Sequence, residues 1–149
     1  MFKNLLIATD GSELSNKALD VALNLARSGE GTVTVVTVTD PVTSGLAGAS
    51  FGQFDAGGIV AKLEDAYRES AEKILAAARA RAGEGGATVK TIYVPEQLAA
   101  DGIIATAADQ GCDLIVMGSH GRRGINRLLL GSQAAEVLAR STLPVLVVK

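Results

Sequence analysis

The residues with the clearest chemical potential form a glycine-rich run between positions 118 and 132. It reads Gly118-Ser-His-Gly121-Arg-Arg-Gly124-Ile-Asn-Arg-Leu-Leu-Leu-Gly131-Ser132. A Gly-x-x-Gly turn lets backbone N–H groups point into a concavity without interference from a Cβ atom. A helix that begins at Ser132 would add free N–H groups and the positive end of its dipole. Together these features predict a phosphate-binding loop.

The side chains of this run fit the same prediction. The Ser132 hydroxyl can donate a hydrogen bond, and Arg122, Arg123 and Arg127 can neutralise phosphate charge. For Arg122 and Arg123 a purely solvated position is the alternative. His120 has the chemistry of a general base, but the sequence indicates neither a nucleophile nor a partner carboxylate for it. We therefore expect His120 to hydrogen-bond phosphate or to be exposed, and we predict no catalytic residue.

Other nucleotide and metal signatures are missing from the chain. No Gly-x₄-Gly-Lys-[Ser/Thr] occurs, which argues against a P-loop enzyme. The first turn reads Asp10-Gly-Ser, so it is not the Gly-x-Gly-x-x-Gly of a dinucleotide dehydrogenase. Cys112 stands alone, without a second cysteine nearby, and is expected to be an inert thiol. No metal-ligating residues are predicted.

Alternating strands and helices must position the loop. Short apolar runs predict strands at 5–8, 32–38, 88–94, 113–118 and 144–148. Helical spacing predicts a helix after Ser12, which is its expected N-cap, and a second from Ile59 to about Gly83. The second helix should bury the side that carries Ile59, Leu63, Tyr67, Ala71, Ile74 and Ala78. A third helix is expected from Pro95 to near Gly111, and a fourth over 132–140.

This alternation predicts one α/β domain over residues 1–149, with a mostly parallel sheet covered by helices on both faces. Ligands of such a sheet sit beyond the carboxyl ends of its strands, where the strand order reverses. The glycine-rich run follows the strand at 113–118, so it lies at that end. The segment from Pro41 to Gly58 also lies there and is expected to be a loop that closes over the ligand as a lid.

Composition limits the remaining classes of function. The chain has 149 residues, 48% hydrophobic and 20% charged, with a formal net charge of −2, so disorder is excluded. Mild acidity argues against nucleic-acid binding, which needs a basic face. No apolar run approaches the ~18 residues of a membrane span, and Asp10 comes too early for a signal peptide. A single cysteine fits a reducing compartment, so a cytoplasmic location is expected.

The glycine pattern closely resembles that of the universal stress protein family, in its ATP-binding branch. The branch has Gly-x₂-Gly-x₉-Gly-[Ser/Thr], which is complete here as Gly118, Gly121, Gly131 and Ser132. The segments 5–12, 36–40, 113–122 and 143–148 resemble family segments in the same order. The resemblance implies an open five-stranded parallel sheet of order 3-2-1-4-5, Rossmann-like and adenine nucleotide α-hydrolase-like, with ATP at the switch between strands one and four.

The resemblance also implies roles for individual residues. Asp10 and backbone groups of Ala8 and Val38 would hold adenine and ribose. The phosphates, with a Mg²⁺ ion held through them, would be bound by Gly118, Ser119, His120, Gly121, Arg122, Arg123, Gly131, Ser132 and Gln133. A role for Asp10 as a turn residue alone is the alternative.

Three functions follow as hypotheses. The first is an ATP-binding regulatory or stress-response module without strong catalysis. The second is a slow ATPase with water positioned by His120 or Asp10, and the third is a nucleotide-free, chaperone-like module. The apolar segment from Pro144 to Val148 would be an edge strand, which predicts a homodimer formed through this strand, as is common in the family.

Overall fold

Five short aliphatic segments pair side by side into one parallel sheet. The structure is a computed structural model that describes residues 1–42, 56–121 and 129–149. The strands are β1 (Asn4–Ala8), β2 (Thr32–Val38), β3 (Lys90–Val94), β4 (Leu114–Gly118) and β5 (Val145–Val148). Their order across the sheet is β3-β2-β1-β4-β5, which confirms the expected topology.

The central strand β1 shows why the sheet must be covered on both sides. Leu5, Leu6 and Ile7 are consecutive, and all three are buried. Because successive strand residues point to opposite faces, a buried run of this kind requires cover above and below the sheet. β1 pairs with β2 through Leu5↔Val33 and with β4 through Leu5↔Leu114. Strands β2 and β3 therefore lie on one side of β1 and strands β4 and β5 on the other, so the strand order reverses at β1.

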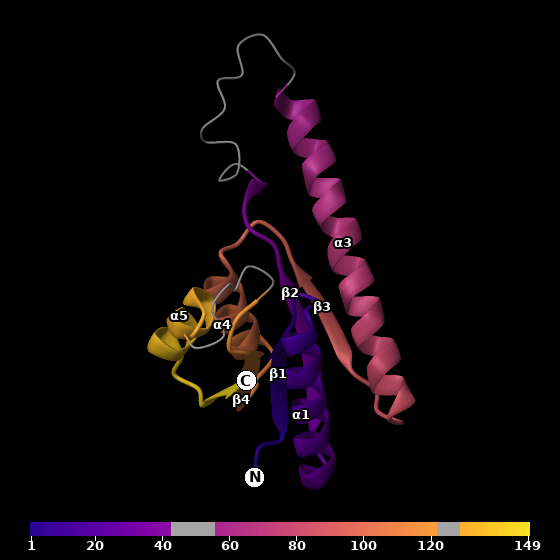
Figure 1. Cartoon of the computed structure of the whole chain (residues 1–149), viewed down its shortest axis with the longest axis vertical. Coiled ribbons are helices and arrows are strands. Elements are labelled where there is room, and N and C mark those ends of the chain that lie inside the picture. The colour runs from indigo at the N-terminus through magenta and orange to yellow at the C-terminus, as the bar shows by residue number, and fades with distance from the viewer. Residues whose placement is uncertain (43–55, 122–128) are drawn as a thin grey trace.

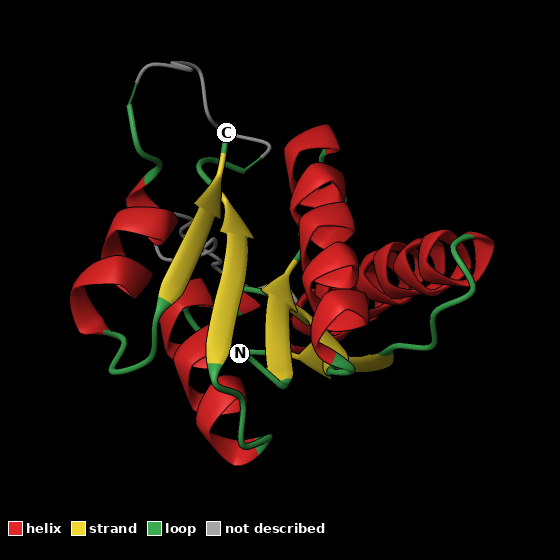
Figure 2. Ribbon diagram, turned by 90° about the horizontal axis from the view of Figure 1, so that it is seen from below, coloured by secondary structure: helices red, strands yellow, loops and turns green. Residues whose placement is uncertain are grey.

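Helices cover the two faces in pairs, as Figures 1 and 2 show. The pair α1 (Glu13–Gly29) and α3 (Ala56–Glu84) lies on one face. The pair α4 (Ala99–Asp109) and α5 (Ser132–Arg140) lies on the other. Each pair packs against its own cluster of aliphatic side chains, so the sheet lies between two cores.

The start of α1 is fixed by a side-chain cap. Ser12 is the N-cap, as predicted, and its Oγ accepts a hydrogen bond from the Ser15 N–H at 3.2 Å. Farther along, Asp20 of α1 accepts two hydrogen bonds from the Arg81 guanidinium of α3, at 2.7 and 2.6 Å. These hydrogen bonds hold the pKa of the Asp20 carboxyl below its ordinary value, against the opposing effect of partial burial.

Helix α3 buries only part of the expected side. Ala71 and Ala78 are buried as predicted, together with Leu75 and Ala82, but Ile59, Leu63 and Ile74 are half-buried and Tyr67 is 38% exposed. Figure 1 shows the physical reason, because the N-terminal half of α3 extends past the ends of the strands. Helical periodicity alone does not reveal how far along a helix the sheet reaches.

Helix α4 begins later than the proline suggested. Its first residue is Ala99, four residues after Pro95. Glu96 has a φ of 58°, a left-handed conformation that interrupts helical geometry. The Gln97 N–H donates to the Thr39 carbonyl at 3.1 Å, which ties this turn to the end of β2. Residues 95–98 are therefore held by a hydrogen bond to the end of β2, and the helix begins only after them, although Pro95 is a typical first residue of a helix.

Two of the sequence-based predictions concern segments that the structure does not describe. The predicted lid from Pro41 to Gly58 lies mostly outside the described residues, as do Arg122, Arg123 and Arg127. Within the described part of the chain, no helix is both long and apolar enough to span a lipid bilayer.

Candidate functional site

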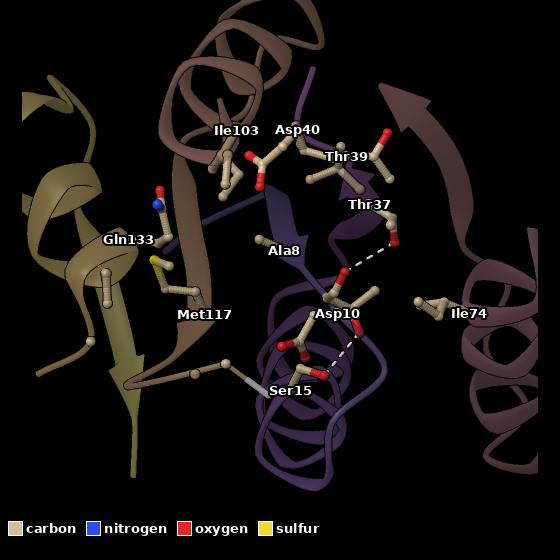
Figure 3. Close-up of a pocket in the computed structure, with 18 of the residues that line it drawn as sticks. Ala8, Asp10, Ser15, Thr37, Thr39, Asp40, Ile74, Ile103, Met117 and Gln133 are labelled. Atoms are coloured by element: carbon tan, nitrogen blue, oxygen red, sulfur yellow. Dashed lines mark hydrogen bonds between the residues drawn. The ribbon is translucent and has the colours of Figure 1, made fainter. Parts of the chain in front are cut away.

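A cavity of about 560 Å³ opens at the carboxyl ends of β1, β2 and β4 (Figure 3). This is the position that the strand reversal at β1 predicts for a ligand. Most of the predicted site residues line it: Ala8, Asp10, Val38, Gly118, His120, Gly121, Gly131, Ser132 and Gln133. Ser119 is buried between two of these lining segments. The structure thus brings together three loops that are far apart in the sequence.

Asp10 belongs both to a turn and to the cavity wall. Its Oδ1 accepts a hydrogen bond from the Ser12 N–H at 3.0 Å, which shapes the turn between β1 and α1. Its Oδ2 faces Gly121, where an ideal Cβ would lie only 2.7 Å from that oxygen. Ser12, and not Asp10, caps the helix. The carboxylate therefore lies between the first turn and the glycine-rich run, at the edge of the cavity.

Three buried hydroxyl side chains hold this turn against β2. The Thr9 and Ser15 hydroxyl oxygens are 3.0 Å apart, and Ser15 also donates to the Ser12 carbonyl at 2.9 Å. The Thr37 hydroxyl donates to the Thr9 carbonyl at 3.0 Å, and Figure 3 shows this bond and the Thr9–Ser15 bond as dashed lines. None of these three residues was predicted from the sequence as part of the site. The feature that could have indicated Thr9 and Thr37 is that both are hydroxyl residues at the ends of neighbouring strands.

The end of β2 presents backbone groups to the cavity. The Thr9 N–H donates to the Val36 carbonyl, and the Thr39 N–H donates to the Val94 carbonyl, each at 3.0 Å. The Val36 carbonyl therefore points toward β1 and the Thr39 N–H toward β3. Because peptide groups alternate in direction from one strand residue to the next, the N–H and carbonyl of Val38, two residues after Val36, point toward the β1 side. The pairing of β1 with β2 ends at Ala8↔Val36. The Val38 N–H and carbonyl therefore extend past the last residue of β1, into the mouth of the cavity.

Apolar side chains from four elements surround this backbone edge. They are Ala8 of β1, Val36 and Val38 of β2, Ala99 and Ile103 of α4, and Met117 of β4. In Figure 3, Ile103, Ala8 and Met117 lie around one side of the cavity, with Asp40 at its rim. A flat apolar group with polar atoms on its edge would fit beside Val38, because its faces would meet aliphatic side chains and its edge would meet peptide groups.

The opposite side of the cavity is formed by two backbone segments in close contact. The Gly131 N–H donates to the Ser119 carbonyl at 2.6 Å. An ideal Cβ at Gly131 would lie 2.9 Å from that carbonyl oxygen and 3.0 Å from the His120 Cα. Since the φ of Gly131 is −62°, the backbone conformation does not require glycine there. The close approach of the two segments does.

The N-terminus of α5 borders the same space. Gly131 is its N-cap, and no side chain caps the helix. Gly131, Ser132, Gln133 and Ala134 all line the cavity, so the first turn of α5 faces it. The first N–H groups of a helix lack intrahelical acceptors and carry partial positive charge. An anion placed here would therefore receive hydrogen bonds from the backbone.

Formal positive charge plays a small part in the described wall of the cavity. No lysine or arginine is among the described residues that line it, and His120 is its one basic side chain. The His120 Nδ1 lies 3.2 Å from the Ser119 Oγ. In the part of the chain that the structure describes, no group of three or more His, Cys, Asp or Glu side chains is placed to hold a metal ion. Anion binding would depend there mainly on backbone N–H groups.

Gly118 has a different role from Gly121 and Gly131. An ideal Cβ at Gly118 would lie 3.2 Å from the Leu14 Cγ of α1. A side chain at this position would therefore press first on the packing of α1. Its backbone lines the cavity, but replacing Gly118 would disturb the helix as well as the ligand space.

Comparisons with known proteins agree with this architecture. The family model described as "Universal stress protein family" matches residues 1–149. Universal stress protein YxiE of Bacillus subtilis (strain 168) is 34% identical over 152 aligned positions, which cover all of both chains.

Solved structures give the same result. The structure of hypothetical protein MJ0577, a protein of Methanocaldococcus jannaschii, has a TM-score of 0.82 at 29% identity and covers 100% of this chain and 96% of its own. A universal stress protein crystallised in complex with cAMP has a TM-score of 0.68 at 26% identity, covering 99% of this chain and 97% of its own. The chain belongs to the universal stress protein family.

Proposed function

We propose that the chain binds ATP in the cavity at the carboxyl ends of β1, β2 and β4, and acts as a nucleotide-dependent regulatory module. The observation that carries the proposal is the approach of Gly131 to Ser119 and His120, beside the uncapped N-terminus of α5. This arrangement presents backbone donors to an anion and leaves no room for a Cβ atom. The complex of a related family member with cAMP supports a nucleotide as the ligand.

The geometry suggests how the nucleotide would lie. The adenine would sit beside Val38, with its faces against aliphatic side chains and its edge on the Val38 peptide groups. The Asp10 carboxylate is placed to accept hydrogen bonds from ribose hydroxyls. The phosphates would meet the turn at 118–121 and the first turn of α5. Arg122 and Arg123 would add positive charge from outside the described residues.

A Mg²⁺ ion, if bound, would depend on the nucleotide. Mg²⁺ commonly binds through one or two carboxylates together with substrate phosphates. Here we propose that the phosphate oxygens of the bound nucleotide supply its ligands, because the described residues offer no group of carboxylates placed to hold the ion. The ion would then enter and leave with the nucleotide, and would not bind the chain alone.

Two measurements on the purified protein test this proposal. Heat denaturation followed by chromatography of the supernatant should release adenine nucleotide, and calorimetry of the nucleotide-free protein should show saturable ATP binding. Phosphate release in the presence of ATP and Mg²⁺ separates a binding module from a slow ATPase. Turnover that vanishes in His120→Ala, while binding persists, would favour the ATPase. A flat calorimetric titration with no co-purified nucleotide would overturn the proposal.

We also propose that two copies pair through β5. All four residues of β5 are half-buried, and the strand has one neighbour in the sheet, β4. The Ile115 N–H donates to the Pro144 carbonyl and the Ser119 N–H to the Val148 carbonyl. By alternation, the peptide groups of Val145 and Val147 face the free edge. A second β5 related by a two-fold axis would satisfy them.

A proline scan of β5 tests this pairing. Val147→Pro removes an N–H that faces the free edge and should shift the sedimenting species to monomer, with the far-ultraviolet signal retained. The matched control is Leu146→Pro, which removes an N–H on the β4 side and should destabilise the fold. Wild-type protein that sediments as a monomer at micromolar concentration would contradict the proposal.

A further inference from the structure

Gly102 stands inside helix α4 at a position where the helix itself gives no reason for glycine. Its N–H donates to the Leu98 carbonyl at 3.0 Å, and its carbonyl accepts from the Thr106 hydroxyl at 2.6 Å. The residue is therefore in regular helical geometry. Glycine at an interior helix position costs about 1 kcal/mol relative to alanine. The explanation must come from what the helix packs against.

The neighbour is Val38 at the end of β2. An ideal Cβ at Gly102 would lie 2.8 Å from Val38 Cγ1, 2.9 Å from Cγ2 and 3.4 Å from Cβ. Both γ-methyls therefore face the helix. The Val38 Cβ has three staggered positions, of which the two methyls occupy two and a hydrogen the third. Because two of the three positions face Gly102, any rotamer of Val38 places at least one methyl against the helix. Side-chain rotation cannot make room, and the helix or the strand would have to move.

The contact between Gly102 and Val38 determines how closely α4 approaches β2 in the part of the cavity proposed for the adenine base. Val38 supplies the peptide groups that extend past β1, and Ile103, which follows Gly102, lines the same cavity together with Ala99. Figure 3 shows Ile103 pointing into this space above Ala8. A shift of α4 against β2 would therefore move one wall relative to the backbone edge that the base would meet.

We infer that Gly102 is a positioning residue for the nucleobase. Its missing side chain allows α4 to lie directly on Val38, which sets the slot in which a planar purine would fit between the α4 side chains and the end of β2. This inference rests on the proposed nucleotide binding and adds the residue that shapes the base-binding half of the site. Gly102 does not contact the ligand and would act through Val38.

The substitution Gly102→Ala tests the inference by calorimetry with ATP. The added methyl should weaken ATP binding about tenfold or more, because overpacking displaces Val38 or the helix. The matched control is Gly83→Ala near the end of α3, where an ideal Cβ meets nothing within 4 Å. That variant gains the same methyl in a helix and should bind ATP like the wild type.

A second substitution distinguishes positioning from general damage. Val38→Ala removes both γ-methyls, so Gly102→Ala should cost at least about fivefold less affinity in the Val38→Ala background than in the wild type. Should Gly102→Ala alone fail to fold, the double variant must still fold and bind ATP. Equal losses in both backgrounds, or a double variant that does not bind, would overturn the inference.

The results distinguish the positioning role of Gly102 from the proposed binding of ATP. If wild-type protein binds ATP and Gly102→Ala binds equally well, Gly102 has no positioning role and the nucleotide proposal stands. If wild-type protein does not bind ATP, both are overturned. If Gly102→Ala weakens binding and Val38→Ala relieves the loss, the structure has identified the residue that sets the base-binding slot.

Discussion

The two ends of the same sheet carry cavities of opposite character. At the carboxyl end, the cavity of about 560 Å³ is bordered by Asp10, by peptide groups and by the start of α5. At the amino end of β4 and β5, a second cavity of about 280 Å³ has mainly apolar walls, formed by Ile104, Ala108, Cys112, Ile115, Ser141, Thr142 and Leu143. The contrast is therefore between a site with directional hydrogen-bonding groups and a gap in aliphatic packing.

Cys112 illustrates the difference between the two ends. Burial, and secondarily the neighbouring Asp113 carboxylate, raises the pKa of its thiol, so the reactive thiolate is disfavoured. This agrees with the expectation of an inert cysteine. At the carboxyl end, by contrast, close approaches between glycines and backbone atoms create space and expose donors. In an open parallel sheet, ligands bind beyond the carboxyl ends of the strands, which is where these backbone donors lie.

The largest effect is expected from Gly131→Val. Its side chain would overlap the Ser119 carbonyl and the His120 backbone, forcing the two loops apart. We expect ATP affinity to fall by more than about 100-fold, because backbone donors on both segments would be displaced. Calorimetry measures the loss, and circular dichroism checks that the fold persists. Unchanged affinity would mean that this end of the sheet does not bind the phosphates.

A smaller loss is expected from Asp10→Ala. The substitution removes the proposed acceptor for ribose hydroxyls and the Oδ1 that organises the turn, so affinity should fall about tenfold. Asp10→Asn is the matched variant, since its amide oxygen can still accept from the Ser12 N–H. If the asparagine variant loses as much affinity as the alanine variant, the charge on the carboxylate matters more than the turn.

The amino-end cavity should show the reverse pattern. Ile115 is fully buried and lines this cavity. Ile115→Val should reduce the free energy of unfolding by about 1 kcal/mol, because it deletes one packed methylene group. ATP affinity should stay at the wild-type value. A clear change in affinity without loss of stability would show that the two ends are not functionally separate.

The smallest effect concerns the Asp20–Arg81 pair, remote from both cavities. Its side chains are 43% and 42% exposed, so Asp20→Asn should cost well under about 1 kcal/mol at neutral pH. Because folding lowers the pKa of Asp20 from its ordinary 3.8, the pair stabilises the protein fully above that value and loses its contribution as pH falls below it. Denaturant unfolding at several pH values should show the variant and wild type converging in acid. A constant difference across this range would mean that the carboxylate charge is not involved.

Much of the fold was predictable because its signals are local. Consecutive aliphatic residues predicted buried parallel strands, and Ser12 predicted the start of α1. The late start of α4 was not predictable, since the bond from Gln97 to Thr39 joins residues that are distant in sequence. How much of the predicted side of α3 is buried depends on where the strands end, which helical periodicity does not encode.

The candidate site divides in the same way. Gly121 and Gly131 could be predicted as lining residues because both lie in one short stretch of sequence directly after a strand. Thr9 and Thr37 were missed, since their hydrogen bond forms only when two strands end side by side. Gly102 was missed for a related reason. A glycine inside a helix carries no local signal until the register of α4 on β2 is known.

A two-dimensional amide NMR titration with ATP distinguishes binding at the carboxyl end of the sheet from binding at its amino end. We expect saturable shifts at Val38, Gly118, Gly121, Gly131 and Gln133, with the amides of Cys112, Ile115 and Leu143 unaffected. Shifts concentrated at the amino-end cavity, or none at saturating nucleotide, would contradict this expectation.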